Sequence, residues 1–373
     1  MKRAGNLYGR IAQPENLRQA FLKAIRGKRG KAEVIAYTAN LDRNLRRLHD
    51  QLSAGHVDVG HYHFFTIHEP KERLICAASF PERVLHHAIM NVCEPVLERY
   101  AIQDSYACRT GKGMHAAVRR AQSFARGYPW YLKLDIRKYF DSIPHAPLLR
   151  LLERRIKDKA VLRLVAAIVG THDSAGTGVA EAVPPGGGEP DGAEAVPPAS
   201  GSMEGRPPCR PIVTTGRGLP IGNLLSQHLA NLYLGHLDHW IKETLRVRGY
   251  VRYMDDFVLW AEDKSILQGY WRAIQEFLEA ELKLELKNNV QLNRSGRGLP
   301  FLGYRVFPHC LTLGPRARRR FARRLRGYEQ EYRQGNWTEA ELQRHTDALL
   351  AYVQFADTLS LRRGIIARMK GVA

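Results

Sequence analysis

The chain has 373 residues, a hydrophobic fraction of 44% and a formal net charge of +20. This length is too great for one simple core and suits two or three packed units, and no apolar run is long enough to cross a membrane. The excess of basic residues favours a polyanionic partner, most often a nucleic acid, over an inert basic surface. Because the basic N-terminus is not followed by an apolar stretch, we expect no secretory signal and a cytoplasmic protein.

The first 60 residues are predicted to be helical, because apolar residues recur three and four positions apart in NLRQAFLKAIRGK and LDRNLRRLHDQL. Two strand-like stretches follow, HYHFFTIHEP and RLICAAS, and then an amphipathic helix that Pro81 opens. The next turn, SYACRTGKG, leaves Lys112 between two glycines. We predict that Lys112 is exposed, and whether it contacts a phosphate backbone or only solvent stays open.

The middle of the chain combines a strand with an insert of unusual composition. The alternation in WYLKLDIRKYF places Leu132 and Leu134 on one face of a strand, and Lys133 and Asp135 on the other. Residues 172–211 are rich in Pro, Gly, Ala and Glu. We predict that they form a disordered segment or a loose surface loop without chemistry.

The remainder of the chain is predicted to alternate between helices and strands. The stretch GLPIGNLL opens a long helix to about Leu245. A hairpin, an amphipathic helix and a strand follow in YVRYMDDFVLWAED, SILQGYWRAIQEFLEAELK and LPFLGYRVF. The C-terminal part is helical and basic, with seven arginines in PRARRRFARRLR and a capping box formed by Thr338 and Glu341.

Two adjacent aspartates, Asp255 and Asp256, stand between apolar strand formers in VRYMDDFVLW. A hairpin turn explains two polar residues here, but not two acids in so basic a chain. Neighbouring carboxylates repel each other and raise one pKa unless a cation lies there, and oxygen ligands favour Mg²⁺. Asp135 ends another strand, and Asp135 and Asp255 on adjacent strands could bridge two metal ions about 4 Å apart, the arrangement for phosphoryl transfer. Asp141 is a weaker candidate, because its surroundings favour a helix or turn start.

Five motifs, in order along the chain, resemble those of bacterial reverse transcriptases. They are the fingers motifs KERLICAASFPERVLHHAI and SYACRTGKG; the palm motif LDIRKYFDSI with YMDD about 120 residues later; motif B, GLPIGNLLSQHLANLYL; and the primer-grip strand LPFLGYRVF. The resemblance covers the chain from about residue 60, apart from the acidic insert. It implies an α+β right-hand polymerase fold with fingers (1–127), a palm of antiparallel sheet backed by helices (128–305) and a helical basic thumb (306–373). The palm range includes a finger segment (146–171) and the insert (172–211).

The resemblance implies an RNA-directed DNA polymerase with a two-metal mechanism. Asp135 and Asp255 would bind two Mg²⁺ ions, or Mn²⁺, together with the carbonyl of Ile136. Asp256 would be the third catalytic carboxylate. The lysine that is usual near the end of motif D is replaced by Val290, and Lys287 is the nearest substitute.

Other residues of the matching motifs would contact the substrates. Phe140 would be the steric gate that excludes a ribose 2′-OH, so that deoxynucleotides are preferred. Arg73, assisted by Lys71, would hold the triphosphate, and Arg83 would contact the template or support the fingers; ordinary surface arginines are the alternative. The residues expected to contact nucleic acid are Arg83, Lys112, Arg318, Arg319, Arg320, Arg323 and Arg324.

Motif B resembles that of a subgroup, the reverse transcriptases of diversity-generating retroelements. Within motif B, Ile221 and Gln227 are the first and last residues of IGNLLSQ, where many relatives carry Gln and Pro. Together with Gly222 they would lie at the nucleotide. A Gln would hydrogen-bond there, so Ile221 predicts looser base selection, unless it only packs at a helix start.

That subgroup copies a template RNA into cDNA with errors at adenines, for mutagenic retrohoming. The implied partners are the template RNA, the RNA–DNA hybrid, dNTPs and a small basic accessory protein that forms a pentamer. A phage-defence or retron-type reverse transcriptase is one alternative. A catalytically idle RNA-binding protein is the other.

Overall fold

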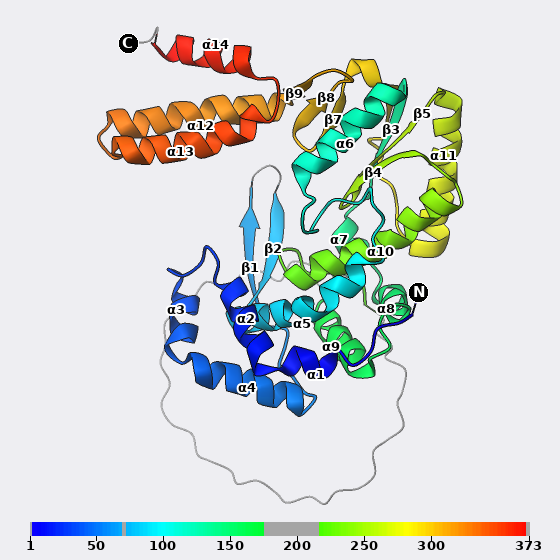
Figure 1. Cartoon of the computed structure of the whole chain (residues 1–373), viewed down its shortest axis with the longest axis vertical. Helices are drawn as coiled ribbons and strands as arrows, with labels where there is room; N and C mark the ends of the chain where they lie inside the picture. The colour runs from blue at the N-terminus through cyan, green and yellow to red at the C-terminus, as the bar shows by residue number, and fades with distance from the viewer. Residues whose placement is uncertain (1, 69–71, 175–215, 371–373) are drawn as a thin grey trace, which may run out of the picture.

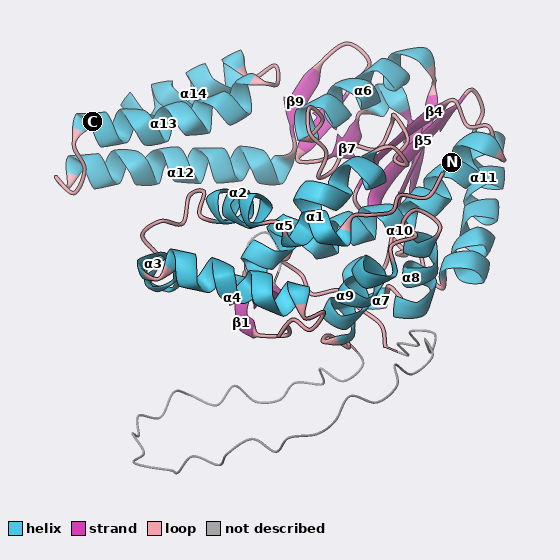
Figure 2. Cartoon of the chain, turned by 60° about the horizontal axis from the view of Figure 1, so that its bottom comes forward, coloured by secondary structure: helices cyan, strands magenta, loops and turns pink. Residues whose placement is uncertain are grey.

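The computed structural model describes residues 2–68, 72–174 and 216–370. Helices and antiparallel sheets alternate along this part of the chain, which confirms the predicted α+β class (Figures 1 and 2). No helix within these ranges is long and apolar enough to span a bilayer. Lys71 and most of the predicted insert at 172–211 lie outside the described residues.

Helix α5 (Phe80–Glu98) is the centre of the N-terminal helices. The helix predicted here is confirmed, and twelve of its 19 residues are buried, so most of its surface is covered. Pro81 lies in its first turn, where the missing N–H costs nothing. The helices around it confirm the predicted helical start of the chain: α1 (Tyr8–Ala12), α2 (Pro14–Ala24), α3 (Ala32–Ala39) and α4 (Leu41–Ser53).

A two-stranded hairpin rises from these helices (Figure 1). It consists of β1 (Tyr62–Ile67) and β2 (Arg73–Ala78), which pair antiparallel with Phe64 opposite Cys76. Both strand-like stretches of the sequence are therefore confirmed. Phe64, Phe65 and Leu74 are exposed on the hairpin.

The central sheet has four antiparallel strands in the order β4–β5–β3–β6. Their bounds are β3 (Trp130–Asp135), β4 (Gly249–Tyr253), β5 (Asp256–Ala261) and β6 (Gln291–Arg294). Leu132 and Leu134 pack into the core shared with the N-terminal helices, whereas Tyr131 packs into a second core on the other face. The alternation predicted for this strand is confirmed, and it leaves Lys133 and Asp135 on the Tyr131 face.

Further helices share a core with the central sheet and the N-terminal helices, and one of them, α11 (Lys264–Phe277), packs on β3, β5 and β6. Helix α10 is buried along most of its length, and Tyr233 and Leu237 are fully covered. A π-helical turn at Leu278–Leu282 extends α11 before the chain returns toward β3. These helices are α7 (Tyr139–Ser142), α8 (His145–Glu153), α9 (Lys159–Gly170), α10 (Leu224–Glu243) and α11 (Lys264–Phe277).

The other face of the sheet is covered by α6 (Met114–Gly127). Its residues Ala117, Val118 and Ala121 are fully buried in the second core with Val258 of β5. The predicted fingers–palm boundary at residue 127 assigns α6 to the fingers, whereas the helix packs on β4, β5 and β8 (Tyr304–Val306).

The stretch LPFLGYRVF is a hairpin and not the single strand that its pattern predicted. β7 (Leu299–Phe301) turns at Leu302 and Gly303, both with positive φ, into β8 (Tyr304–Val306), and β9 (Leu311–Leu313) completes a small sheet. The predicted capping box of Thr338 and Glu341 is present. It opens the second of three C-terminal helices, α12 (Pro315–Arg333), α13 (Glu339–Gln354) and α14 (Leu359–Lys370).

Candidate active site

Three carboxylates meet where β3 ends and β5 begins. Asp135 and Asp256 are directly opposite each other in the antiparallel pair, and Asp255 precedes Asp256 in the β4–β5 turn. Burial and then the neighbouring charge of Asp135 raise the pKa of Asp255 to about 6. The strand end and the turn thus bring together carboxylates from two distant parts of the sequence.

Two lysine ammonium groups neutralise these carboxylates. Nζ of Lys133 donates to Oδ2 of Asp256 at 2.9 Å and to the carbonyl of Pro300, also at 2.9 Å. Nζ of Lys287 donates to Oδ2 of Asp135 at 2.7 Å. Burial raises the pKa of Asp256, and the charge of Lys133 acts against that rise. Each lysine therefore supplies part of the positive charge that the acidic cluster requires.

The carboxylate oxygens that remain fit a divalent cation. Oδ1 of Asp135 and Oδ1 of Asp256 are buried and accept no hydrogen bond. Such oxygens are costly unless a cation or a donor reaches them. Among the described residues no three His, Cys, Asp or Glu side chains form a ready-made metal cage. An ion here would need further oxygen ligands besides that of Asp135. Asp255, which lies beside Asp135, and the carbonyl of Ile136, the next residue, are the predicted ones.

The segment before α10 lies against both β2 and α7. The carbonyl of Phe140 accepts a hydrogen bond from Leu219 N–H at 2.8 Å, and the carbonyl of Ile221 accepts one from Cys76 N–H at 3.0 Å. Arg73 is exposed at the start of the same strand β2. Phe140, Ile221 and the strand that carries Arg73 are thereby joined around one segment.

Gly222 and Asn223 attach this segment to β2. Gly222 has a φ of 111°, and a Cβ atom there would lie 2.9 Å from Cγ2 of Ile75. A side chain at this position would therefore be both strained and obstructed. Buried Asn223 accepts from Ala78 N–H at 2.9 Å and donates to the carbonyl of Cys76 at 2.8 Å.

Residues 68–306 match the family described as Reverse transcriptase (RNA-dependent DNA polymerase), which is more than half of the chain. The chain belongs to the reverse transcriptase family. The predicted family resemblance is therefore confirmed, whereas the match does not distinguish a diversity-generating subgroup.

Individual relatives of this reverse transcriptase are distant. Nuclear intron maturase 1, mitochondrial, of Arabidopsis thaliana is 29% identical over 86 residues, which are 23% of this chain but only 12% of the maturase. Protein YkfC of Escherichia coli (strain K12) is 24% identical over 300 residues and covers 72% of each chain. Apo telomerase from Candida Tropicalis has a TM-score of 0.44 at 8% identity, over 74% of this chain and 53% of the telomerase.

Three other predicted contact residues of this reverse transcriptase have partners within the protein. Arg83 donates to Glu33 at 3.0 Å and to the carbonyl of Ala78 at 2.7 Å, which supports the fingers interpretation of its role. Lys112 is half-buried and not exposed as predicted, because its ammonium group donates to the carbonyl of Gln103 and lies over the Tyr106 ring. Gln227 faces the adjacent turn, where the Cys108 thiol donates to its Oε1.

The five predicted thumb arginines all lie on α12. Arg318, Arg319, Arg323 and Arg324 are exposed, whereas Arg320 is half-buried with its guanidinium 5.9 Å from the centre of the Tyr352 ring. A groove of about 950 Å³ runs between α12 and α14 and includes Arg318 and Arg319 in its lining.

Sequence reasoning did not single out several residues that shape the site. Lys133 was placed on the correct strand face, but nothing in its pattern identified Asp256 as its partner. Asn223 and Arg252 lie in the quoted motifs, where a buried polar residue between apolar neighbours was the available signal.

Proposed function

We propose that this member of the reverse transcriptase family is an active RNA-directed DNA polymerase that copies a template RNA into cDNA. The observation that carries the proposal is the meeting of Asp135, Asp255 and Asp256 beside two lysines, with buried carboxylate oxygens left unsatisfied. A catalytically idle RNA-binding protein would have no need to keep this costly cluster.

In the proposed reaction, Asp135, Asp255 and the carbonyl of Ile136 would hold two Mg²⁺ ions, which Mn²⁺ could replace. The ions would activate the primer 3′-hydroxyl and stabilise the leaving pyrophosphate. Asp256 would be an auxiliary carboxylate, because Lys133 already neutralises it at 2.9 Å. Lys287 donates to Asp135 and would supply the cation that motif D otherwise provides.

Substrate selection would depend on the segment around motif B. Phe140 would exclude a ribose 2′-OH, Arg73 would hold the triphosphate with Lys71, and Ile221 and Gly222 would lie beside the new base pair. In support, one segment links Phe140 and Ile221 to the strand of Arg73 through backbone hydrogen bonds.

The proposed division is fingers at 1–127, palm at 128–305 and thumb at 306–373. The exposed arginines of α12 would bind the phosphates of the template–primer duplex, with a strong dependence on salt.

The finer proposal is a polymerase that makes errors at adenines for retroelement-driven mutagenic retrohoming, together with a small basic pentameric accessory protein. It is supported by apolar Ile221 and by Gln227 in motif B. A phage-defence or retron-type enzyme is the alternative. Primer extension on an RNA template tests the polymerase, and sequencing of the cDNA tests the subgroup.

A further inference from the structure

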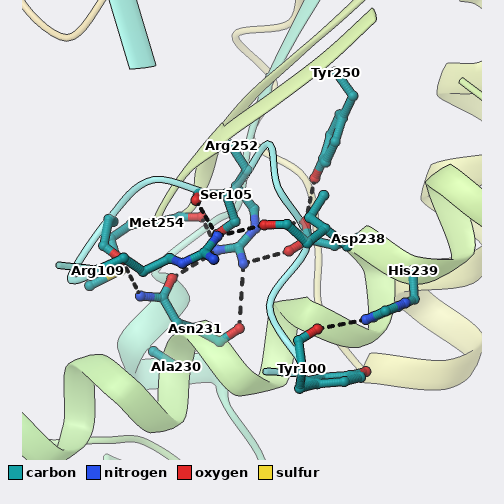
Figure 3. A network of polar contacts seen from close by, with 12 residues as sticks. Tyr100, Ser105, Arg109, Ala230, Asn231, Asp238, His239, Tyr250, Arg252 and Met254 are labelled. Atoms are coloured by element: carbon teal, nitrogen blue, oxygen red, sulfur yellow. Dashed lines mark hydrogen bonds and ion pairs between the residues drawn. The ribbon is translucent and has the colours of Figure 1, made fainter. Parts of the chain in front are cut away.

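A buried guanidinium holds the β4–β5 turn from inside the protein (Figure 3). Arg252 lies on β4, two residues before Met254, and is only 1% exposed. Its Nη1 donates to the carbonyl of Met254 at 2.9 Å and to Oδ1 of Asn231 at 3.0 Å. Its Nε and Nη2 donate to the two carboxylate oxygens of Asp238 at 2.7 Å and 2.6 Å. One side chain thus links the catalytic turn to helix α10.

The partner carboxylate is equally buried. Asp238 is 0% exposed on α10, and the hydroxyl of Tyr250 donates to its Oδ1 at 2.7 Å. Burial opposes the charge of Arg252, but Asp238 raises the pKa of the guanidinium above its usual range, so the ion pair is charged. Apolar residues of similar volume would stabilise a core at least as well as such a pair. The presence of the Arg252–Asp238 ion pair beside the candidate active site is therefore not explained by stability alone.

The conformation of Met254 supplies another reason. Met254 has a φ of 56°, in the left-handed region that a side chain with a Cβ atom disfavours. The residue directly precedes Asp255, so its backbone angles set the position of that carboxylate. Its carbonyl is the atom that Arg252 binds.

We propose that Arg252 and Asp238 are positioning residues that hold the Met254 turn in its left-handed conformation and so place Asp255 against Asp135. The pair also couples the position of α10, which begins at motif B, to the catalytic turn. The proposal rests on the proposed polymerase for its kinetic test, but its metal-binding test is independent of turnover.

Arg252→Lys is the decisive variant. A lysine keeps the charge, but its donors all lie on one nitrogen. It therefore cannot bind both oxygens of Asp238 and also reach Asn231 and the Met254 carbonyl, as the three guanidinium nitrogens do. We expect kcat for dNTP incorporation to fall about 10- to 100-fold, with KM within about threefold, as for a misplaced catalytic group. We also expect Mn²⁺ affinity, measured by electron paramagnetic resonance without nucleotide, to fall several-fold. Unchanged kcat and unchanged Mn²⁺ affinity would overturn the proposal.

Arg109→Lys is the matched control. Arg109 has the same kind of partners, the Glu98 carboxylate and the carbonyls of Ile102 and Ser105, and its hydrogen bonds do not include the Met254 carbonyl. Arg109→Lys should lower the thermal midpoint of the protein, because hydrogen bonds of the folded state are lost. It should leave kcat and Mn²⁺ affinity within about twofold of wild type. Equal kinetic losses in both variants would show that Arg252 is only a structural residue.

A double-mutant cycle with Met254→Asn separates positioning from packing. Asn tolerates the left-handed conformation better than Met does. Arg252→Lys should therefore cost at most about threefold in the Met254→Asn background, because the turn needs less support. Equal losses in both backgrounds would contradict the proposal. If Arg252→Lys does not fold, Asp238→Asn takes its place in the same cycle with the same expectations.

A failure of the proposed polymerase function can be distinguished from a failure of the positioning role proposed for Arg252 and Asp238. A wild-type protein that makes no cDNA refutes the proposed function. The comparison of Mn²⁺ affinities between wild type, Arg252→Lys and Arg109→Lys still decides whether Arg252 positions the aspartates.

Discussion

The ammonium group of Lys287 lies 2.7 Å from Oδ2 of Asp135, and a backbone hydrogen bond of 2.8 Å joins the same two residues. The chain reaches this place after the π-helical turn at Leu278–Leu282, and the isolated bridge of Ile136 with Leu286 fixes its register. The ammonium group thus lies within the carboxylate cluster, although the resemblance predicts the motif D lysine at the position of Val290.

Replacement of Lys287 by Met is expected to tighten Mn²⁺ binding by up to ~5-fold, equivalent to about 1 kcal/mol for a partly exposed charge. The ammonium group competes with a metal ion for Asp135, and methionine removes the charge while keeping an unbranched stem. Electron paramagnetic resonance titration measures the affinity. Lys264→Met, at an exposed position on α11, is the control. Weaker or unchanged binding in Lys287→Met would refute the competition.

Acid should destabilise the protein through buried His86. Burial, followed by the charges of His87 and Arg83, lowers the pKa of His86 to about 4, and neither ring nitrogen has a hydrogen-bond partner. The folded pKa lies below the unfolded value, so the stabilising effect is complete above about pH 6.5 and is lost as the pH falls toward 4.

Between pH 6.5 and 4, His86→Met should therefore lose about 3 kcal/mol less of the free energy of unfolding than wild type does. Urea unfolding at several pH values measures this difference. His309→Met, at an exposed position, should follow wild type. Parallel pH profiles for wild type and His86→Met would exclude His86 as the acid-sensitive group.

The sequence predicted the elements of the site better than their contacts. Strand alternation placed Asp135 at a strand end, and YMDD was placed correctly in a hairpin, because both follow from local patterns. The ion pair of Lys133 with Asp256 joins two strands that are far apart in the sequence. The ion pair of Arg252 with Asp238 joins a strand to a helix, and the sequence does not show which sides of these two elements face each other. No periodicity therefore reveals either pair. Lys112 was misjudged because its glycine neighbours do not show that the Tyr106 ring lies beneath it.

The base selectivity of the proposed polymerase should change at Ile221. Ile221→Gln introduces a side chain that can hydrogen-bond near the nucleotide. It should reduce misincorporation opposite template adenine about tenfold or more, since tenfold is the low end of what even an apolar contact discriminates. Sequencing of cDNA made on a defined RNA template measures the error rate. Ile221→Val, which stays apolar, should keep the wild-type rate. Equal error rates opposite adenine in wild type, Ile221→Gln and Ile221→Val would show that Ile221 does not determine base selection.

Binding of the template–primer duplex should depend on the exposed arginines of α12. Arg319→Gln and Arg324→Gln should each weaken binding at low salt and reduce the slope of log affinity against log salt by about 1. Fluorescence anisotropy at several salt concentrations measures the slope. Arg43→Gln, on α4 at the other end of the molecule (Figure 1), should leave it unchanged. A wild-type affinity that does not respond to salt would contradict phosphate binding by this helix.

The central claim is that Asp135 and Asp255 form the catalytic centre of an RNA-directed DNA polymerase. Primer extension on an RNA template, with a DNA primer, dNTPs and Mg²⁺, tests it most directly. Wild type should synthesise cDNA, and Asp255→Ala, with the same purification and the same folded state by circular dichroism, should fall to background. A wild-type protein that makes no cDNA, or an Asp255→Ala variant that extends the primer as fast as wild type, would contradict the account.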